Sequence, residues 1–252
     1  MSDENFMKMC FDLAKNAWGR VSPNPYVGAV LVKDGRIIGK GFHKGPGHAH
    51  AEIDAINNAE ESVEGATLYC NLEPCCHLNK RTPPCAQRLA QEKIKKVVVS
   101  NLDPNPQVAG KGLRILKEAG IEVATGELEE EGKELNEVFF KFIQTGAPFI
   151  HLKWAQTLDG KIATSDGNSK WISSIQARRQ VHWERLGHDA IMVGARTLKN
   201  DNPSLTIREN DKVIKALKRI VVASKDDFPP DLKFFSDEHK DQSLLLLPKE
   251  QI

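Results

Sequence analysis

The stretch that decides the fold is YVGAVLVKDGRIIGKGF, residues 26–42, in which two extended apolar runs flank Asp34-Gly35. An Asp-Gly pair between two such runs predicts a β-hairpin, because both residues tolerate the positive φ angles of a tight hairpin turn. Beyond it, helical periodicity alternates with short strand-like runs, which favours an α/β fold with a mainly parallel sheet and helices on both faces. The expected helices cover residues 6–17, 50–58, 112–119 and 128–142, with another opening near Cys85, and the expected strands cover residues 67–71, 97–100 and 121–124.

A change of composition at residues 145–148, Thr-Gly-Ala-Pro, predicts a linker between two domains. The domains are expected to cover residues 1–146 and 147–252. The second begins with an apolar run that predicts a strand over residues 149–155. Further on, the pattern predicts a helix over residues 174–186 and strands over residues 190–193 and 219–223.

The net charge and the distribution of the cysteines exclude several classes of protein. The chain has 35 Lys and Arg against 34 Asp and Glu, so its net charge of +1 gives no general attraction for nucleic acid or an anionic membrane. The N-terminus, Met-Ser-Asp-Glu-Asn, is acidic where a signal peptide is basic, and no apolar run approaches the roughly eighteen residues of a membrane span. Four of the five cysteines lie within residues 70–85, which favours reduced thiols over a disulfide framework. We therefore expect a soluble, cytoplasmic protein.

Three residues of the cysteine-rich region make a coherent zinc site. His50, Cys75 and Cys85 supply the three protein ligands of a catalytic zinc, with the fourth position open for water. Cys85 follows Pro83-Pro84 and His50 begins an expected helix, so both ligands are expected at helix N-termini. Glu52 would then face the bound water rather than the metal. The chemistry that needs this arrangement is attack of water on an electron-poor carbon with loss of ammonia, with Glu52 carrying the protons.

Two alternatives remain open at this point. A structural zinc would take a fourth ligand such as Cys76 or His77, and the chain would then be a non-catalytic, zinc-stabilised binding module. The chain could also be a zinc deaminase of another nucleobase, although the net charge disfavours a tRNA substrate. Cys10, on an apolar helix face, and Cys70, in an expected strand, are most simply buried packing residues.

The first half of the chain resembles a known superfamily. His50-Ala51-Glu52, followed by Pro74-Cys75 and a later cysteine, resembles the signature of the zinc nucleobase deaminases. The long gap before Cys85 is similar to that of the riboflavin-pathway branch, as are the stretches SPNP (22–25), DPNPQV (103–108) and GKG (110–112). The resemblance implies a cytidine-deaminase-like three-layer α/β/α domain. It also implies that Asn24 and His43 contact the substrate, a phosphorylated pyrimidine; without it, they would be a turn residue and a surface histidine.

The second half resembles the reductase part of the bifunctional riboflavin biosynthesis deaminase/reductase family, on the stretches LDGK (158–161), WIS (171–173), VGART (193–197) and DNPSLTIR (201–208). The resemblance implies a dihydrofolate-reductase-like α/β domain that uses NADPH to reduce the deaminated ribosylamino intermediate to a ribityl chain. It places Ala155, Trp171, Thr197, Asp201 and Ser224 at the NADPH site, and Ser169, Arg185, Leu205 and Arg208 at the substrate. An arginine fork suits a phosphate, although either arginine alone would be an ordinary surface charge and Trp171 alone a core residue.

The chain departs from this family in three places. The loop between Cys75 and Cys85 is one residue longer and lacks the family's glycine, so either Lys80 or Arg81 could take the basic position near the substrate phosphate. Cys76 replaces the family's usual serine. The family's Gly-Gly segment for the cofactor pyrophosphate has no counterpart, so we expect a partial reductase domain. Unpaired strand edges in a partial sheet favour a homo-oligomer.

Overall fold

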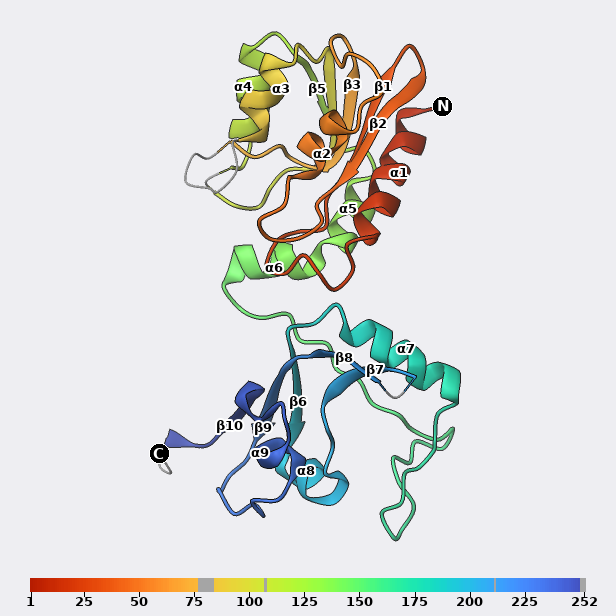
Figure 1. Cartoon of the computed structure of the whole chain (residues 1–252), viewed down its shortest axis with the longest axis vertical. Coiled ribbons are helices and arrows are strands. Elements are labelled where there is room, and N and C mark those ends of the chain that lie inside the picture. The colour runs from red at the N-terminus through yellow and green to blue at the C-terminus, as the bar shows by residue number, and fades with distance from the viewer. Residues whose placement is uncertain (77–83, 107, 211, 250–252) are drawn as a thin grey trace. The chain divides into compact units, whose positions relative to one another are not determined.

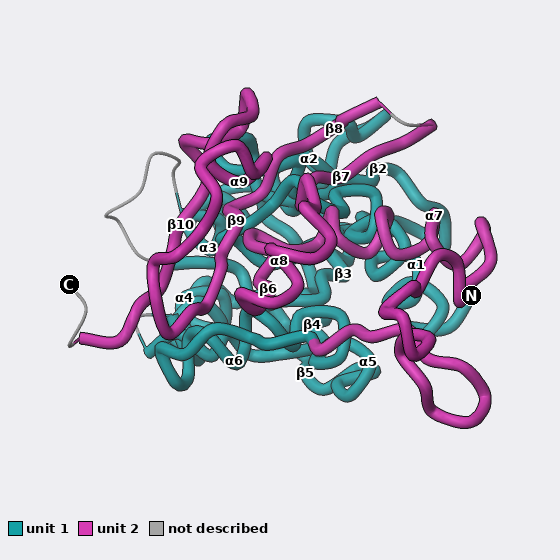
Figure 2. Tube along the Cα trace, turned by 90° about the horizontal axis from the view of Figure 1, so that it is seen from below, with its two compact units in different colours: residues 1–151 teal, residues 152–252 magenta. Residues whose placement is uncertain are grey.

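The computed structural model describes residues 1–76, 84–106, 108–210 and 212–249. The chain forms two compact units, Met1–His151 and Leu152–Ile252, coloured separately in Figure 2. The two units divide between residues 151 and 152, a few residues after the expected domain boundary. The boundary between residues 146 and 147 stays a prediction. No helix in the described part of the chain is both long and apolar enough to cross a bilayer.

The first unit is built on a five-stranded sheet with the order β2-β1-β3-β4-β5 (Figure 1). β1 pairs antiparallel with β2 and β3, whereas β3, β4 and β5 are parallel, so the expected sheet with an initial hairpin is confirmed. Asp34 and Gly35 form the hairpin turn with φ angles of 49° and 74°. The strands are β1 Gly28–Lys33, β2 Arg36–Phe42, β3 Thr67–Leu72, β4 Lys96–Asn101 and β5 Glu122–Thr125.

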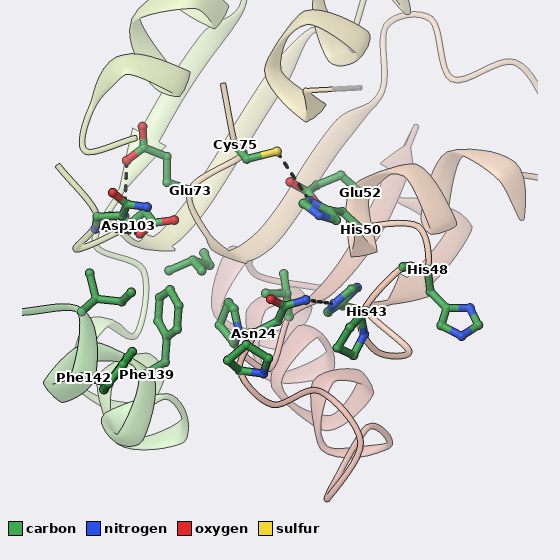
Figure 3. A pocket seen from close by; sticks show the side chains of 18 residues that line it. Asn24, His43, His48, His50, Glu52, Glu73, Cys75, Asp103, Phe139 and Phe142 are labelled. Atoms are coloured by element: carbon green, nitrogen blue, oxygen red, sulfur yellow. Dashed lines mark hydrogen bonds between the residues drawn. The ribbon is translucent and has the colours of Figure 1, made fainter. Parts of the chain in front are cut away.

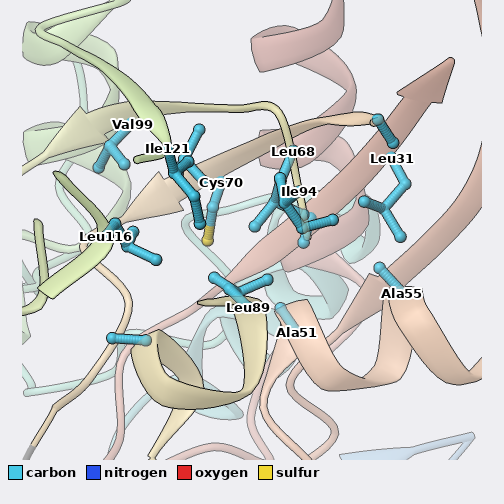
Figure 4. Close-up of a cluster of buried hydrophobic side chains, with 14 of the residues drawn as sticks. Leu31, Ala51, Ala55, Leu68, Cys70, Leu89, Ile94, Val99, Leu116 and Ile121 are labelled. Atoms are coloured by element: carbon cyan, nitrogen blue, oxygen red, sulfur yellow. The ribbon is translucent and has the colours of Figure 1, made fainter. Parts of the chain in front are cut away.

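Alternating side chains on these strands build a separate core on each face of the sheet. On β1, Ala29 and Leu31 enter one core and Val30 and Val32 the other, because successive strand residues point to opposite faces. Helices α1 and α5 cover the second core, and α2, α3 and α4 cover the first, which is drawn in Figure 4. The helices are α1 Asp3–Lys15, α2 Ala51–Asn57, α3 Cys85–Gln91, α4 Lys111–Glu118 and α5 Glu129–Leu135. Cys70 and Cys10 are fully buried in the first and second core, as predicted.

The single helix expected over residues 128–142 is wrong, because the chain forms α5 and then α6, Glu137–Thr145. The break falls at Asn136, whose side chain is buried. Its Oδ1 accepts from the Tyr26 N–H at 2.7 Å and its Nδ2 donates to the Tyr26 carbonyl at 2.9 Å. The amide thus pairs with Tyr26 as a neighbouring strand would, and this long-range contact overrides the helical periodicity.

The second unit contains a parallel sheet of order β10-β9-β6 and an antiparallel pair, β7 and β8. The strand expected over residues 149–155 is wrong, since residues 147–174 form neither helix nor strand. A strand needs a hydrogen-bonded neighbour, and none of the described strands pairs with this segment. The elements are α7 Ile175–Arg185, β6 Ala190–Gly194, α8 Ala195–Asp201, β7 Thr206–Glu209, β8 Lys212–Ala216, β9 Lys218–Val222, α9 Lys233–Ser236, a 3-10 turn Lys240–Gln242 and β10 Ser243–Leu246.

Gly41 lets α2 approach β2 closely, so we expect Gly41→Ala to destabilise the first unit. A methyl group at residue 41 would lie 2.3 Å from the Ala55 nitrogen and 2.5 Å from the Ala51 oxygen, both of them backbone atoms of α2. Overpacking of this kind costs roughly 1–3 kcal/mol. Thermal unfolding followed by circular dichroism should show a lower transition temperature than that of the wild type. Gly194→Ala is the control, because nothing lies within 4 Å of the added methyl group there; equal transitions in the two variants would contradict the prediction.

Candidate metal centre and active site

His50 lies at the start of α2 and holds one side of the candidate metal centre. It is the N-cap of that helix, in an extended conformation, and its carbonyl accepts the first helical hydrogen bond from the Asp54 N–H at 2.8 Å. Its side-chain Nδ1 lies 3.5 Å from Cys75 Sγ and 3.4 Å from Cys85 Sγ. The sequence-based prediction that these three residues come together is therefore correct in geometry.

Cys75 and Cys85 are fixed to each other by backbone contacts. Cys75 follows the end of β3, and Cys85 begins α3 after Pro84, which is the N-cap. The Cys85 N–H donates to Cys75 Sγ at 3.4 Å, and the Ala86 N–H donates to the Cys75 carbonyl at 3.1 Å. The start of α3 therefore holds both sulfur atoms beside His50.

The ligand atoms of His50, Cys75 and Cys85 all lie within 4.8 Å of one another. One imidazole nitrogen and two sulfurs are donors that zinc prefers, and three protein ligands leave one position of a tetrahedron open. Cys76 does not belong to this group among the described residues; its partly buried side chain packs against the core. His77, Lys80 and Arg81 lie outside the described residues, so their expected roles stay predictions.

Glu52 is the second residue of α2, in the first turn of the helix, and lies beside His50 at the same cavity. The residue is almost completely buried, at 3% exposure, and lines the cavity beside His50 (Figure 3). Burial raises the pKa of Glu52 above its usual value, and the neighbouring Cys75 adds to the rise while His50 opposes it. A carboxyl group so placed can exchange protons with a molecule in the cavity.

The cavity in front of this centre has a volume of about 620 Å³. Its apolar wall comes from α6, through Phe139, Phe142 and Ile143. Because α6 starts at the Asn136 break, the contact between Asn136 and Tyr26 also places this wall. The polar residues that line the cavity are Asn24, His43, His48, His50, Glu52, Glu73, Cys75, Asp103 and Asn105.

Asn24 and His43 form one hydrogen-bonded pair at the cavity (Figure 3). His43 Nδ1 lies 3.1 Å from the Ala49 carbonyl, which can only accept, so that nitrogen carries the proton. His43 Nε2 therefore accepts from Asn24 Nδ2 at 2.9 Å. This orientation leaves Oδ1 as the atom of the Asn24 amide that is not engaged by His43. His43 is buried, at 4% exposure, and is not a surface histidine.

The residues expected at the reductase site all lie in the second unit, and the structure groups some of them. Ser169 and Trp171 line a hollow of about 660 Å³ that Thr157, Asp159 and Lys161 also border. The Arg178 guanidinium lies 4.2 Å from the centroid of the exposed Trp171 ring. Thr197 and Asp201 share α8, Leu205 is buried, and Ala155 and Ser224 lie outside helices and strands.

Arg185 and Arg208 lie near each other, around a histidine that the sequence did not single out. Arg185 donates to the Thr206 carbonyl at 3.1 Å, and the Arg208 N–H donates to His182 Nδ1 at 3.1 Å. Burial lowers the pKa of His182, and both arginines lower it further. The signal in the sequence was the spacing of His182 and Arg185, which lie one turn apart on α7.

Glu73 and the apolar wall of α6 are two further features of the site that were not predicted from the sequence. Glu73 lies two residues before Cys75, in a stretch that was interpreted from its cysteines and its proline alone. Phe139 and Phe142 looked like the buried side of one long helix, but the break at Asn136 directs α6 along the cavity.

Two family models match the chain, one for each half. The model for the cytidine and deoxycytidylate deaminase zinc-binding region matches residues 1–101, which include His50, Glu52, Cys75 and Cys85. The model for the RibD C-terminal domain matches residues 148–250. A crystal structure of a diaminohydroxyphosphoribosylaminopyrimidine deaminase/5-amino-6-(5-phosphoribosylamino)uracil reductase from Thermotoga maritima is 40% identical, with a TM-score of 0.82 over 98% of this chain and 80% of that one. The chain belongs to the RibD family.

Other RibD proteins agree with this assignment. Acinetobacter baumannii RibD, in its form 1 structure, is 40% identical with a TM-score of 0.89, over 98% of this chain and 69% of that one. The riboflavin biosynthesis protein RibD of Aquifex aeolicus is 52% identical over 82% of this chain, and that of Bacillus amyloliquefaciens is 47% identical over 93%. The chain spans 58% and 63% of the lengths of these two curated relatives. Both expected folds, the cytidine-deaminase-like domain and part of the RibD reductase domain, are confirmed.

Proposed function

We propose that the first unit is a zinc-dependent deaminase of riboflavin biosynthesis. It removes the 2-amino group of 2,5-diamino-6-ribosylamino-4(3H)-pyrimidinone 5′-phosphate by hydrolysis. The observation that carries the proposal is the convergence of His50, Cys75 and Cys85 within 4.8 Å, beside the buried Glu52 at the cavity. The substrate class is supported by the name of the Thermotoga maritima relative, which denotes a deaminase of this diaminopyrimidine.

The donor set suits zinc, with His50, Cys75 and Cys85 as ligands. Two thiolates and a neutral imidazole balance the charge of Zn²⁺, so the site needs no further anion. When bound there, zinc supplies the Lewis acidity that makes hydroxide available at neutral pH. The two hydrogen bonds from the start of α3 to Cys75 hold both sulfurs close to each other without a metal.

Glu52 is the catalytic acid and base in this proposal. Its carboxylate accepts a proton from the attacking water as the new C–O bond forms at C2 of the pyrimidinone. It gives that proton to the ring nitrogen, takes a second proton from the hydroxyl now bound to C2, and gives this one to the departing amine. The C–N bond then breaks with release of ammonia, and C2 is left as a carbonyl. The burial of Glu52 at the cavity keeps bulk water from exchanging these protons freely.

Asn24 and His43 orient the substrate. The hydrogen bond from Asn24 to His43 fixes the amide so that its Oδ1 can accept from an N–H on the edge of the pyrimidine ring. The rings of Phe139 and Phe142 provide an apolar surface against which a flat heterocycle can pack.

Ammonia release tests the deaminase. The purified chain reconstituted with zinc should release one ammonia per diaminopyrimidinone phosphate, measured by an enzyme-coupled assay. Chelator-stripped protein should be inactive, and added zinc should restore it. Cytosine, guanine and tRNA adenosine serve as competing substrates, and a preference for one of them would replace the proposed substrate. Four protein ligands at the metal by X-ray absorption, with no ammonia from any substrate, would favour a structural zinc instead.

For the second unit we propose a part of the NADPH-dependent reductase that acts on 5-amino-6-(5-phosphoribosylamino)uracil. The match of residues 148–250 to the RibD C-terminal domain supports it. In this proposal Ala155, Trp171, Thr197, Asp201 and Ser224 contact NADPH, and Ser169, Arg185, Leu205 and Arg208 contact the substrate. The neighbouring Arg185 and Arg208 suit its 5′-phosphate. NADPH titration monitored by the quenching of tryptophan fluorescence tests binding, and a flat titration would remove this assignment.

We further propose that the protein works in the cytoplasm as a homo-oligomer. Val138 on α6 is half exposed, and an exposed apolar side chain there suits a contact between copies. Sedimentation equilibrium measures the mass directly, and a monomer at micromolar concentration would overturn the oligomer.

A further inference from the structure

Glu73 is a buried acid for which the proposed mechanism has no use. It follows the end of β3 and precedes Pro74-Cys75, so it belongs to the segment that carries one candidate zinc ligand. The residue is 3% exposed, and none of the ion pairs among the described residues includes it. A buried carboxylate must find hydrogen-bond donors, because leaving it without partners is costly.

The donors to Glu73 are backbone N–H groups of one distant segment. Its Oε2 accepts from Gly110 at 2.9 Å and from Asp103 at 3.3 Å. Its Oε1 accepts from Gly112 at 3.0 Å and from Leu113 at 3.3 Å. Both carboxylate oxygens are thus engaged, and every one of these donors lies between residues 103 and 113.

Three of these four donors belong to the start of α4. The first N–H groups of a helix have no partner within the helix, and a side chain at the N-cap usually satisfies them. Here the N-cap is Gly110, in the left-handed region with φ 75°, and it has no side chain to do so. Glu73 therefore caps α4 from another part of the chain.

The two segments are also in direct backbone contact. A methyl group at Gly112 would lie 2.1 Å from the Pro74 carbonyl oxygen and 3.2 Å from Glu73 Oε1. Only a glycine allows α4 to approach the Glu73-Pro74-Cys75 segment this closely. A shift of α4 or of Glu73 would therefore also move the backbone next to Cys75.

The same carboxylate fixes one wall of the cavity. Asp103 and Asn105 line the cavity together with Glu73 and Cys75, and Figure 3 shows Glu73 and Asp103 joined by a hydrogen bond. Asp103 in turn accepts from the Asn105 N–H at 2.8 Å. Glu73 thus connects the ligand-bearing segment to the polar residues that face a bound substrate.

We propose that Glu73 is a positioning residue that couples metal binding to the shape of the substrate cavity. It holds the backbone of Cys75 against the start of α4, so that Cys75 Sγ keeps its position beside the ligand atoms of His50 and Cys85. It also holds Asp103 and Asn105 in the cavity wall. The zinc part of this proposal rests on the proposed function of the first unit.

Glu73→Gln tests the role in the 252-residue chain. Glutamine keeps the size of the side chain, but its NH₂ group would face two N–H donors and repel them. We expect zinc affinity, measured by competition with a chromogenic chelator, to fall about 10–100-fold, as for other residues that orient metal ligands. We also expect the visible absorption spectrum of the Co²⁺-loaded protein to change, and KM for the pyrimidine to rise more than kcat falls at saturating zinc.

The matched control is Glu118→Gln, which changes an exposed glutamate at the far end of α4, the helix that Glu73 caps, and it should leave all three readouts unchanged. Wild-type zinc affinity and an unchanged Co²⁺ spectrum in Glu73→Gln would overturn the proposal, even if the variant unfolds at a lower temperature. If Glu73→Gln fails to fold, Glu73→Asp, which keeps the charge but shortens the reach, decides by the same two metal measurements. Because metal binding needs no turnover, an inactive wild-type chain would contradict the deaminase and leave the positioning role to be judged separately.

Discussion

Glu52→Gln is expected to lower the rate of ammonia release by about 10²–10⁴-fold, the contribution typical of a positioned general acid and base. Glutamine preserves the shape of the buried side chain and can still form hydrogen bonds in the cavity, but it cannot accept and return a proton. The zinc content should stay at that of the wild type, since Glu52 is not among the residues whose ligand atoms converge. Single-turnover ammonia release and atomic absorption measure the two quantities on the same sample.

Glu60→Gln is the matched control for this experiment. Glu60 is an exposed glutamate a short distance beyond the end of α2, the helix that carries Glu52. Its replacement should leave both the rate and the zinc content unchanged. Activity of Glu52→Gln within about threefold of the control would contradict the role of Glu52, because general acid–base catalysis contributes far more than that.

The metal centre could be predicted from the sequence because its chemistry is unusual. Cysteine and histidine are rare enough that His50, Cys75 and Cys85 restrict the possible ligands to a few combinations, and Glu52 beside His50 favours a catalytic over a structural site. Their convergence within 4.8 Å agrees with the prediction. Glu73 could not be singled out in this way, since a lone glutamate is common and its partners lie 30 to 40 residues away in the chain.

The fold was predictable where local periodicity and long-range contacts agree. The hairpin follows from Asp34-Gly35 between two extended runs, and the parallel strands follow from the alternation of strand-like and helical segments; the structure contains both. The break in the helix expected over residues 128–142 was not predictable. It occurs because the Asn136 side chain forms hydrogen bonds with Tyr26, which lies 110 positions away in the chain. The segment over residues 149–155 has the side chains of a strand but no described partner strand, and a side-chain pattern alone does not supply the hydrogen bonds.

Arg219→Met is expected to destabilise the second unit by about 3–5 kcal/mol, the range for removal of one member of a buried charged pair. Arg219 lies on the central strand β9 and is fully buried. It donates to both oxygens of Asp237, at 2.7 and 2.8 Å, and to Ser243 Oγ at 2.7 Å. It also reaches the Phe234 and Ser204 carbonyls, so methionine would leave several acceptors without their donor.

Urea unfolding at neutral pH measures this loss, and Lys199→Met is its control. Lys199 forms an exposed ion pair with Asp227 in the same unit, so its replacement should leave the free energy of unfolding nearly unchanged. Equal unfolding midpoints for the two variants would show that the Arg219 network contributes no more than a surface pair.

The same network predicts how stability depends on pH. Burial alone would raise the pKa of Asp237, but hydrogen bonds from Arg219 and from the His239 N–H outweigh it and hold the pKa below its usual value. A carboxyl group whose pKa is lower in the folded state stabilises the fold above its unfolded pKa, about 3.9, and loses this contribution as the pH falls through the folded value. The difference in unfolding free energy between wild type and Asp237→Asn should therefore be constant from pH 5 to 7 and shrink below about pH 4. Repeating the comparison in the Arg219→Met background separates Asp237 from other carboxylates: there the difference should be small at every pH, and a pH-dependent difference that survives without Arg219 would assign the effect to another partner.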